Sequence, residues 1–153
     1  MAASVCAGVG RALTLLQNVH AETFRSGRGA VTIALLGPRV LLCDAEGHYD
    51  PPLFEHYARA MTHASQYGPA DIFLDWEKLT GYDSESRRLM TEFVQQNRAR
   101  FTCAHILVRH RLVAMGVSTA SLLIGGGILE AYTERSRFEQ RLRAVRSARG
   151  LPE

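Results

Sequence analysis

Short runs of aliphatic and β-branched residues alternate with amphipathic segments along most of the 153 residues of this sequence. The runs are short enough for strands, and the amphipathic segments carry apolar residues three and four positions apart, as helices do. Strands that alternate with helices of about 12–16 residues indicate crossover connections. The sequence therefore predicts one α/β domain with a mixed, mostly parallel sheet. We expect strands at 31–36, 39–44, 71–75, 103–108 and 128–132, and helices at about 4–24, 51–67, 85–98, 111–123 and 134–149.

Turn and capping residues mark several of these boundaries. Gly37 and Pro38 separate the first two strands, which predicts a hairpin. Asp50 precedes two prolines, and an aspartate can cap the free N–H groups of a helix whose first turn tolerates proline. Gly68-Pro69 ends the helix that begins there.

The net charge of +3 comes from the last predicted helix. Residues 134–153 contain six arginines and three glutamates, whereas the first 133 residues contain equal numbers of basic and acidic residues. Clustered arginines can bind nucleic acid. Here Glu134 and Glu139 interrupt the cluster, and no aromatic set accompanies it. We therefore expect a solvated helix face and no nucleic-acid partner.

Composition and cysteine usage indicate a cytoplasmic protein. Hydrophobic residues make up 46% of the chain, yet no apolar run reaches the roughly 18 residues of a membrane-spanning helix. No signal-peptide pattern is present at the N-terminus. Cys6, Cys43 and Cys103 cannot all pair, and no Cys/His group has zinc-ligand spacing. Free thiols fit a reducing compartment, and we expect neither a metal nor a cofactor.

Residues 1–30 are predicted to be an addition to a domain that spans 31–153. The addition consists of the amphipathic helix at 4–24 and a linker rich in glycine and arginine at 25–29. Val5, Val9, Leu13 and Leu16 give this helix an apolar face. The helix can pack on the core or pair with a second copy, which would make a homo-oligomer.

The segment from Leu74 to Ser86 is the most informative stretch for function. It is expected to run from the end of a strand, through a loop, to the start of a helix, which is where ligands and partners meet open α/β sheets. Asp83, Ser84 and Glu85 crowd that helix start, where the helix dipole favours negative charge. These side chains can act as caps only, or they can form a docking or switch surface.

This segment resembles the signature of the STAS-like family, the sulphate-transporter and anti-sigma-factor-antagonist domains, including the SpoIIAA-like branch. In that family an apolar strand ends in aspartate, a short loop follows, and an apolar-Asp-Ser-Ser-Gly element begins a helix. Asp75 matches the strand-end aspartate, and 82–84 match the apolar-Asp-Ser start. The second serine, which the family usually phosphorylates, falls on Glu85, and the glycine falls on Ser86. The resemblance covers about residues 31–146.

The resemblance implies a STAS-like sheet of four to five strands, with helices mainly on one face. It also implies a bacterial, non-enzymatic regulatory module that binds another protein, such as a kinase-like anti-sigma factor or an assembly component. Glu85 would supply a fixed negative charge in place of a switched one, which leaves Ser84 and Ser86 as candidate phosphorylation sites. The partner-docking residues implied by the motif and the helix start are Asp75, Thr80, Asp83, Ser84, Glu85 and Ser86.

Two other functions are open at the sequence level. The N-terminal helix could serve as a lid over an apolar ligand or as a membrane-surface element, which would make the protein an apolar-ligand or lipid-binding module. A hydrolase-type enzyme would have to use His48 with Asp50, or Cys43 with a nearby histidine. No nucleophile motif or metal set supports the enzyme, so no catalytic residue is assigned.

Overall fold

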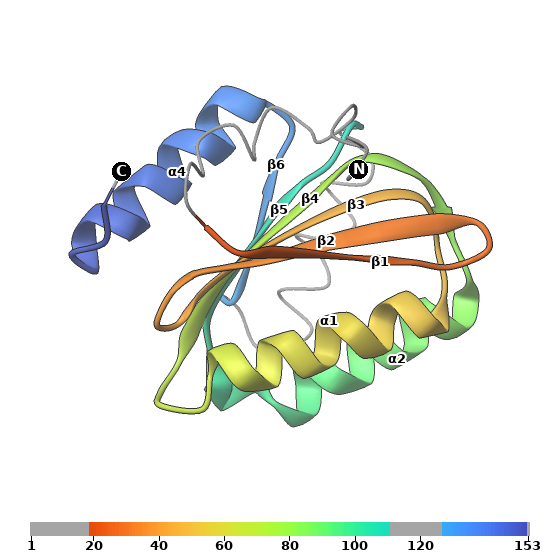
Figure 1. The fold of residues 1–153 in the computed structure, drawn as a ribbon, viewed down its shortest axis with the longest axis horizontal. Helices are drawn as coiled ribbons and strands as arrows, with labels where there is room; N and C mark the ends of the chain where they lie inside the picture. Colours follow the sequence, from red (N-terminus) through yellow and green to blue (C-terminus); the bar gives the residue numbers. More distant parts are fainter. Residues whose placement is uncertain (1–18, 111–126, 153) are drawn as a thin grey trace, which may run out of the picture.

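A computed structural model describes residues 19–110 and 127–152 of the chain. It contains one sheet with the strand order β1-β2-β3-β4-β5-β6 (Figure 1). The first three strands are antiparallel neighbours, whereas β3 to β6 are parallel to one another. The predicted mixed, mostly parallel sheet is confirmed, with one strand more than the expected maximum of five. The strands span Ala21–Arg25, Gly29–Gly37, Val40–Tyr49, Ala70–Tyr82, Phe101–Leu107 and Leu129–Tyr132.

Helices of the described residues cover both faces of this sheet (Figure 1). The first side carries α1 (Pro51–Ala64) and α2 (Ser84–Gln96), and a short 3₁₀ turn, η2 (Arg98–Arg100), follows α2. The opposite side carries α4 (Arg135–Ala148). Helices thus lie mainly on one face, as predicted. None of the helices in the described ranges is long and apolar enough to cross a membrane.

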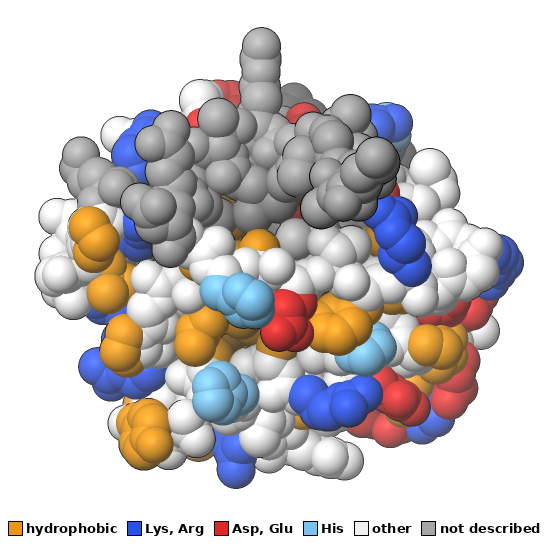
Figure 2. Space-filling view, in the orientation of Figure 1, with side chains coloured by type: hydrophobic (Ala, Val, Ile, Leu, Met, Phe, Trp, Pro, Cys, Tyr) orange, Lys and Arg blue, Asp and Glu red, His pale blue; other side chains and the backbone are white. Residues whose placement is uncertain are grey.

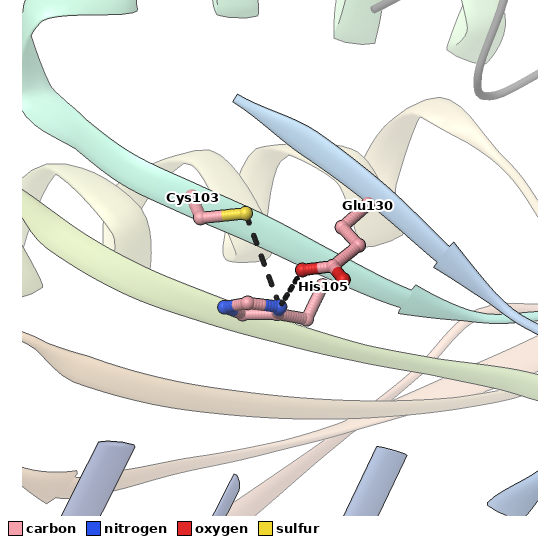
Figure 3. A group of neighbouring side chains, drawn as sticks. All are labelled: Cys103, His105 and Glu130. Carbon is pink, nitrogen blue, oxygen red and sulfur yellow. Dashed lines mark hydrogen bonds and ion pairs between the residues drawn. The ribbon is translucent and has the colours of Figure 1, made fainter. Parts of the chain in front are cut away.

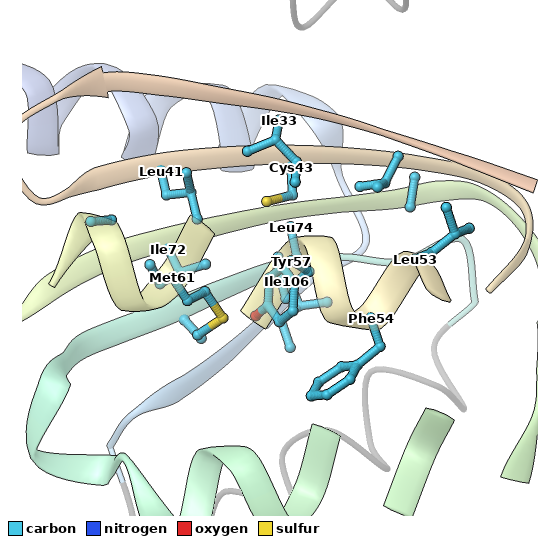
Figure 4. Packing of buried hydrophobic residues seen from close by; sticks show 14 of the residues in the cluster. Ile33, Leu41, Cys43, Leu53, Phe54, Tyr57, Met61, Ile72, Leu74 and Ile106 are labelled. Atoms are coloured by element: carbon cyan, nitrogen blue, oxygen red, sulfur yellow. The ribbon is translucent and has the colours of Figure 1, made fainter. Parts of the chain in front are cut away.

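The larger core lies between the sheet and α1, and its boundaries follow the predicted signals. Asp50 caps α1, because its Oδ1 accepts a hydrogen bond from the Leu53 N–H at 3.3 Å. The amphipathic face of α1 then packs against alternate residues of β2 to β5 (Figure 4). The most buried side chains of this core include Leu53, Tyr57, Met61, Leu41, Cys43, Ile72 and Leu74. Local helical and strand periods therefore predicted this layer correctly.

A smaller core lies under α4. Phe138, Leu142 and Val145 are the buried positions of its predicted apolar stripe. They pack on side chains of the sheet that point away from α1, and the aromatic rings of Phe138 and Phe73 meet edge to face at 5.6 Å. Because β3, β4 and β5 are buried on both faces, they are rich in apolar residues without alternation, as expected of parallel strands.

The helix predicted over 4–24 is wrong in its last turn. Residues Ala21–Arg25 form β1, which pairs antiparallel with β2. Phe24 is better satisfied in a strand, because its ring stacks on His56 of α1 at 3.8 Å while Thr23 bonds the Thr32 hydroxyl at 2.9 Å. The expected linker at 25–29 is the β1–β2 turn. Residues 4–18, the helix predicted at 111–123 and Gly125–Gly126 lie outside the described residues.

The loop expected after Asp75 is absent, because β4 continues to Tyr82. The added half of β4 pairs in parallel with the end of β3, up to Tyr49 opposite Tyr82, with irregular register beside Asp44 and beside Gly47. Polar residues of this half resembled a loop in the sequence. They are strand residues whose charged groups are paired across the sheet, as described below.

Candidate functional site at the start of α2

The end of β4 and the first turn of α2 bring together four of the six predicted docking residues. Thr80, Ser84 and Glu85 are exposed and Asp83 is half-buried. Asp75 and Ser86 are not available to a partner in this structure, because each is only 1% exposed. Asp75 lies in the middle of β4 and contacts α4 instead.

Asp83 is the centre of a polar clamp that joins three segments of the chain. Its Oδ1 lies 2.7 Å from His48 Nε2 at the end of β3 and 2.8 Å from Arg28 Nη2 in the β1–β2 turn. The His48 hydrogen bond, and then Arg28, lower the pKa of Asp83 below its usual value. The Asp83 N–H also donates to the Tyr49 carbonyl at 3.1 Å. The start of α2 is therefore fixed to the end of β3 and to the turn of the β1–β2 hairpin.

A close backbone contact between Gly29 and His48 holds the β1–β2 hairpin beside the clamp. Gly29 begins β2, and a Cβ at this position would lie 2.3 Å from the His48 carbonyl oxygen. Any side chain there would push the hairpin away from β3. The glycine that marked a linker in the sequence thus permits Arg28 to reach Asp83.

The carboxylate of Asp83 does not cap α2, because it makes no hydrogen bond to the first N–H groups of this helix. The first turn of a helix has N–H groups without intrahelical acceptors, and they carry part of the positive end of the helix dipole. Ser84, the first helical residue, is exposed at this position. The helix start can therefore accept a hydrogen-bond acceptor from outside the chain.

The region is less acidic than the sequence suggested. Glu85 is bound by Arg88 through two contacts of 2.6 and 3.2 Å, and Arg88 also bonds Glu92 at 2.7 Å. Asp83 is paired with Arg28, as described above. Both carboxylates of this surface are thus paired with arginines. A partner would therefore recognise the shape of this surface as well as its charge.

Sequence reasoning missed the exposed ring of Tyr82. The motif gave Tyr82 only as the apolar residue before Asp83, yet the residue is 55% exposed at the last position of β4. Strand alternation could not have shown it, because Trp76 and Leu79 both pack on the larger core and the register shifts between Gly47 and His48, so the period of two is broken in this half of β4. Tyr82 is the large hydrophobic side chain of this surface.

The residues that a hydrolase-type enzyme would have to use have other partners in the structure. His48 contacts Asp83, whereas Asp50 caps α1. Cys43 is buried in the larger core, and burial raises the pKa of its thiol well above its usual value. These placements give no reason to assign a catalytic residue.

The structure does not favour the apolar-ligand alternative. A surface hollow of about 480 Å³ lies beside the clamp, but its lining is largely polar and charged. The lining includes Arg25, Ser26, Arg28, Glu46 and Lys78.

A second polar cluster, on the α4 side of the sheet, was not predicted. Asp75 is held by Arg135 of α4 at 2.8 Å, and the same guanidinium bonds Glu77 at 2.5 Å. Asp44 lies opposite Asp75 in the β3–β4 register and is 3.6 Å from Lys78. Two buried carboxylates thus lie side by side, each facing one basic side chain.

At the other end of α4, Arg149 binds Asp71 at 2.6 and 3.1 Å. Burial alone would raise the pKa of Asp71, but the nearby His105 imidazole and the hydrogen bonds from Arg149 bring it below its usual value. Arg146 is only 5% exposed and donates to the Pro152 carbonyl. The solvated arginine face expected of this helix is therefore wrong for three of its arginines, which stabilise the fold.

The face of the molecule in Figure 2 shows Lys and Arg side chains interspersed with Asp, Glu and His. A nucleic-acid interface needs a concentrated basic patch. The described residues visible on this face do not form one.

The Asp44 carboxyl makes stability depend on pH. Burial, and then the nearby Asp75 carboxylate, raise the pKa of Asp44 to about 6. Between the unfolded value near 4 and this folded value, the native state binds more protons, so its stability falls as pH rises through this window. Between pH 4 and 7 the wild type should lose free energy of unfolding as pH rises. In Asp44→Asn we expect this loss to be smaller by about 1–3 kcal/mol. Urea unfolding at several pH values measures this.

The exposed variant Glu55→Gln serves as the control for the pH series, because it also removes one carboxylate but has a solvated side chain. If the free energy of unfolding changed equally with pH in Asp44→Asn and Glu55→Gln, the pH dependence would not come from Asp44.

Comparison with known proteins places the fold. No model of a known protein family matches the sequence, and no curated protein is similar to it in sequence. An uncharacterised DUF3478-family protein from Shewanella loihica PV-4, with a SpoIIAA-like fold, has a TM-score of 0.58 at 13% identity, over 81% of this chain and 93% of that one. The anti-sigma factor antagonist SpoIIAA in its unphosphorylated form has a TM-score of 0.49 at 13% identity, over 79% of this chain and 99% of that one. The chain has a SpoIIAA-like fold, as the motif predicted.

Proposed function

We propose that this protein is a regulatory protein–protein interaction module that docks a partner at the start of α2. The observation that carries the proposal is the exposed ring of Tyr82 beside an uncapped helix start. Tyrosine is enriched among the residues that contribute most to interfaces. The Arg28–Asp83–His48 clamp supports the same idea, because a fixed surface loses less conformational freedom on binding.

The docking surface consists of Thr80, Tyr82, Asp83, Ser84 and Glu85. A partner's aromatic or aliphatic side chains would pack on Tyr82, and an acceptor oxygen would reach the free N–H groups of α2. Ser84 is the candidate for phosphorylation, because it is exposed whereas Ser86 is buried. The motif resemblance makes a kinase-like anti-sigma factor or an assembly component the first partner class to test.

A matched pair of exposed tyrosines tests the proposal. Tyr82 is 55% exposed at the end of β4 beside α2, and Tyr67 is 84% exposed beyond the opposite end of α1. A photo-crosslinking residue placed at 82 should capture one recurring partner in cells, whereas the same residue at 67 should not. With that partner purified, Tyr82→Ala should weaken binding by about tenfold or more, and Tyr67→Ala should leave it unchanged.

The double variant Asp83→Ala/Glu85→Ala provides a second, independent reading. It removes both carboxylates of the surface and should also weaken the captured complex. Full retention of the partner by this variant and by Tyr82→Ala would overturn the proposal.

A further inference from the structure

Cys103, His105 and Glu130 form a cluster on the α4 side of the sheet that the docking surface does not use. Cys103 and His105 lie on β5, and Glu130 extends from the adjacent β6 toward the same imidazole nitrogen (Figure 3). His105 Nδ1 is 3.4 Å from Glu130 Oε2 and 3.9 Å from Cys103 Sγ. All three potential ligand atoms lie within 4.8 Å of one another.

These separations are close to the edges of a zinc tetrahedron. Zinc bonds of about 2.0–2.3 Å at tetrahedral angles place nitrogen and oxygen ligands about 3.4 Å apart, and sulfur and nitrogen about 3.6 Å apart. The oxygen is already at that spacing, and the sulfur is a few tenths of an ångström beyond it. A rotation of the Cys103 side chain would have to bring its sulfur to that spacing.

The other nitrogen of His105 supplies an independent observation. His105 is fully buried, and its Nε2 has no hydrogen-bond partner within normal distance among the residues that the structure describes. That nitrogen faces Asp71 Oδ1 at 3.7 Å, and Arg149 holds the other oxygen of Asp71. Metal-binding histidines usually direct their second N–H to a carboxylate, which fixes the tautomer. With its proton on Nε2, His105 has an unprotonated Nδ1, which is the nitrogen that lies near Cys103 and Glu130.

The charges around Nδ1 favour a cation. Two carboxylates face the His105 ring, with Glu130 Oε2 at 3.4 Å from Nδ1 and Asp71 Oδ1 at 3.7 Å from Nε2. They would partly neutralise a divalent ion bound at Nδ1, and a coordinated thiol adds a further negative charge because it loses its proton. The Tyr132 hydroxyl, 3.1 Å from Nδ1, is the one further polar contact of this nitrogen among the described residues, and an entering ion would displace it.

We propose that Cys103, His105 and Glu130 bind a divalent metal ion of borderline softness, with Zn²⁺ the best match. A mixed sulfur, nitrogen and oxygen set suits zinc better than magnesium or calcium. Three protein ligands leave a fourth position for water, and the 53% exposure of the Glu130 side chain gives a route for entry. The site lies near the start of β4, whereas the proposed docking surface lies at its end.

Metal titration of the full chain tests the site, with zinc and cobalt as the probes. We expect chelator-treated wild-type protein to bind one Zn²⁺ and to give a thiolate-to-cobalt charge-transfer band with Co²⁺. Cys103→Ser and Glu130→Gln should each weaken zinc binding at least tenfold, and Cys103→Ser should abolish the band. Glu130 is exposed, so Glu130→Gln keeps the test interpretable if Cys103→Ser folds poorly.

Cys43→Ala and Glu55→Gln are the matched controls, because they remove a cysteine and a glutamate elsewhere. Both should bind zinc as the wild type does. Absence of zinc binding by the wild type, or equal binding by Cys103→Ser and Glu130→Gln, would overturn the proposal. In that case His105 would be held by its two neighbouring carboxylates without a metal.

Discussion

Replacing Arg135 by methionine is expected to lower the free energy of unfolding by about 3–5 kcal/mol. Arg135 binds Asp75 at 2.8 Å, and Asp75 is only 1% exposed. Without the guanidinium, the Asp75 carboxylate would remain buried beside Asp44, its neighbour in the β3–β4 register. A buried charge that loses its partner costs more than the net value of the pair, because the desolvation of the remaining charge is no longer compensated.

A second variant separates this electrostatic cost from lost packing. Asp75→Asn combined with Arg135→Met removes both charges, and it should recover most of the stability lost in Arg135→Met. The wild type, Asp75→Asn, Arg135→Met and the double variant form a double-mutant cycle. Their chemical unfolding measures the coupling energy between Asp75 and Arg135 directly.

Arg137→Met is the control on the same helix, because Arg137 is exposed. We expect it to change the free energy of unfolding by less than about 0.5 kcal/mol. An Arg135→Met variant as stable as Arg137→Met would show that the Asp75 pair contributes nothing to the fold.

The order of strands and helices could be predicted because its signals are local. Asp50 and Pro51 specify the start of α1, Gly37-Pro38 specifies the hairpin, and the spacing of Phe138 and Leu142 specifies α4. Each of these is a property of a few neighbouring residues, and tertiary contacts only reinforce them.

The errors arose where a residue's environment is set by a distant segment. Phe24 fits a helical period, but β2 and His56 make it a strand residue. Glu77 resembles a loop residue until Arg135, 58 positions later, pairs with it inside the sheet. No local pattern reports such a pairing.

The same limit applies to the candidate sites. The motif located the start of α2 and its exposed residues, yet it also included Asp75 and Ser86, whose burial depends on how β4 continues and on what packs over it. Ligand spacing in the sequence does not point to Cys103 and His105, which lie two positions apart on one strand. Glu130 joins them only through the pairing of β5 with β6.

Phe138→Ala is expected to lower the free energy of unfolding by about 3–5 kcal/mol. The Phe138 ring is fully buried and contacts Phe73 at 5.6 Å and Tyr132 at 5.8 Å, between centroids. Its removal would leave a cavity between α4 and the centre of the sheet, where the surrounding strands cannot collapse. For a domain of this size, we expect the melting temperature to fall by roughly 10 °C.

Hydrogen exchange then decides whether α4 is an integral layer or an appended helix. If it is integral, Phe138→Ala should speed exchange in β4 and β5 as well as in α4, because all three lose the same core. Gln140→Ala, exposed on the same helix, is the control and should leave exchange in the sheet unchanged. Faster exchange confined to α4 would contradict the integral layer. The ion pairs of Asp71 and Asp75 with Arg149 and Arg135, at opposite ends of the helix, favour the first result.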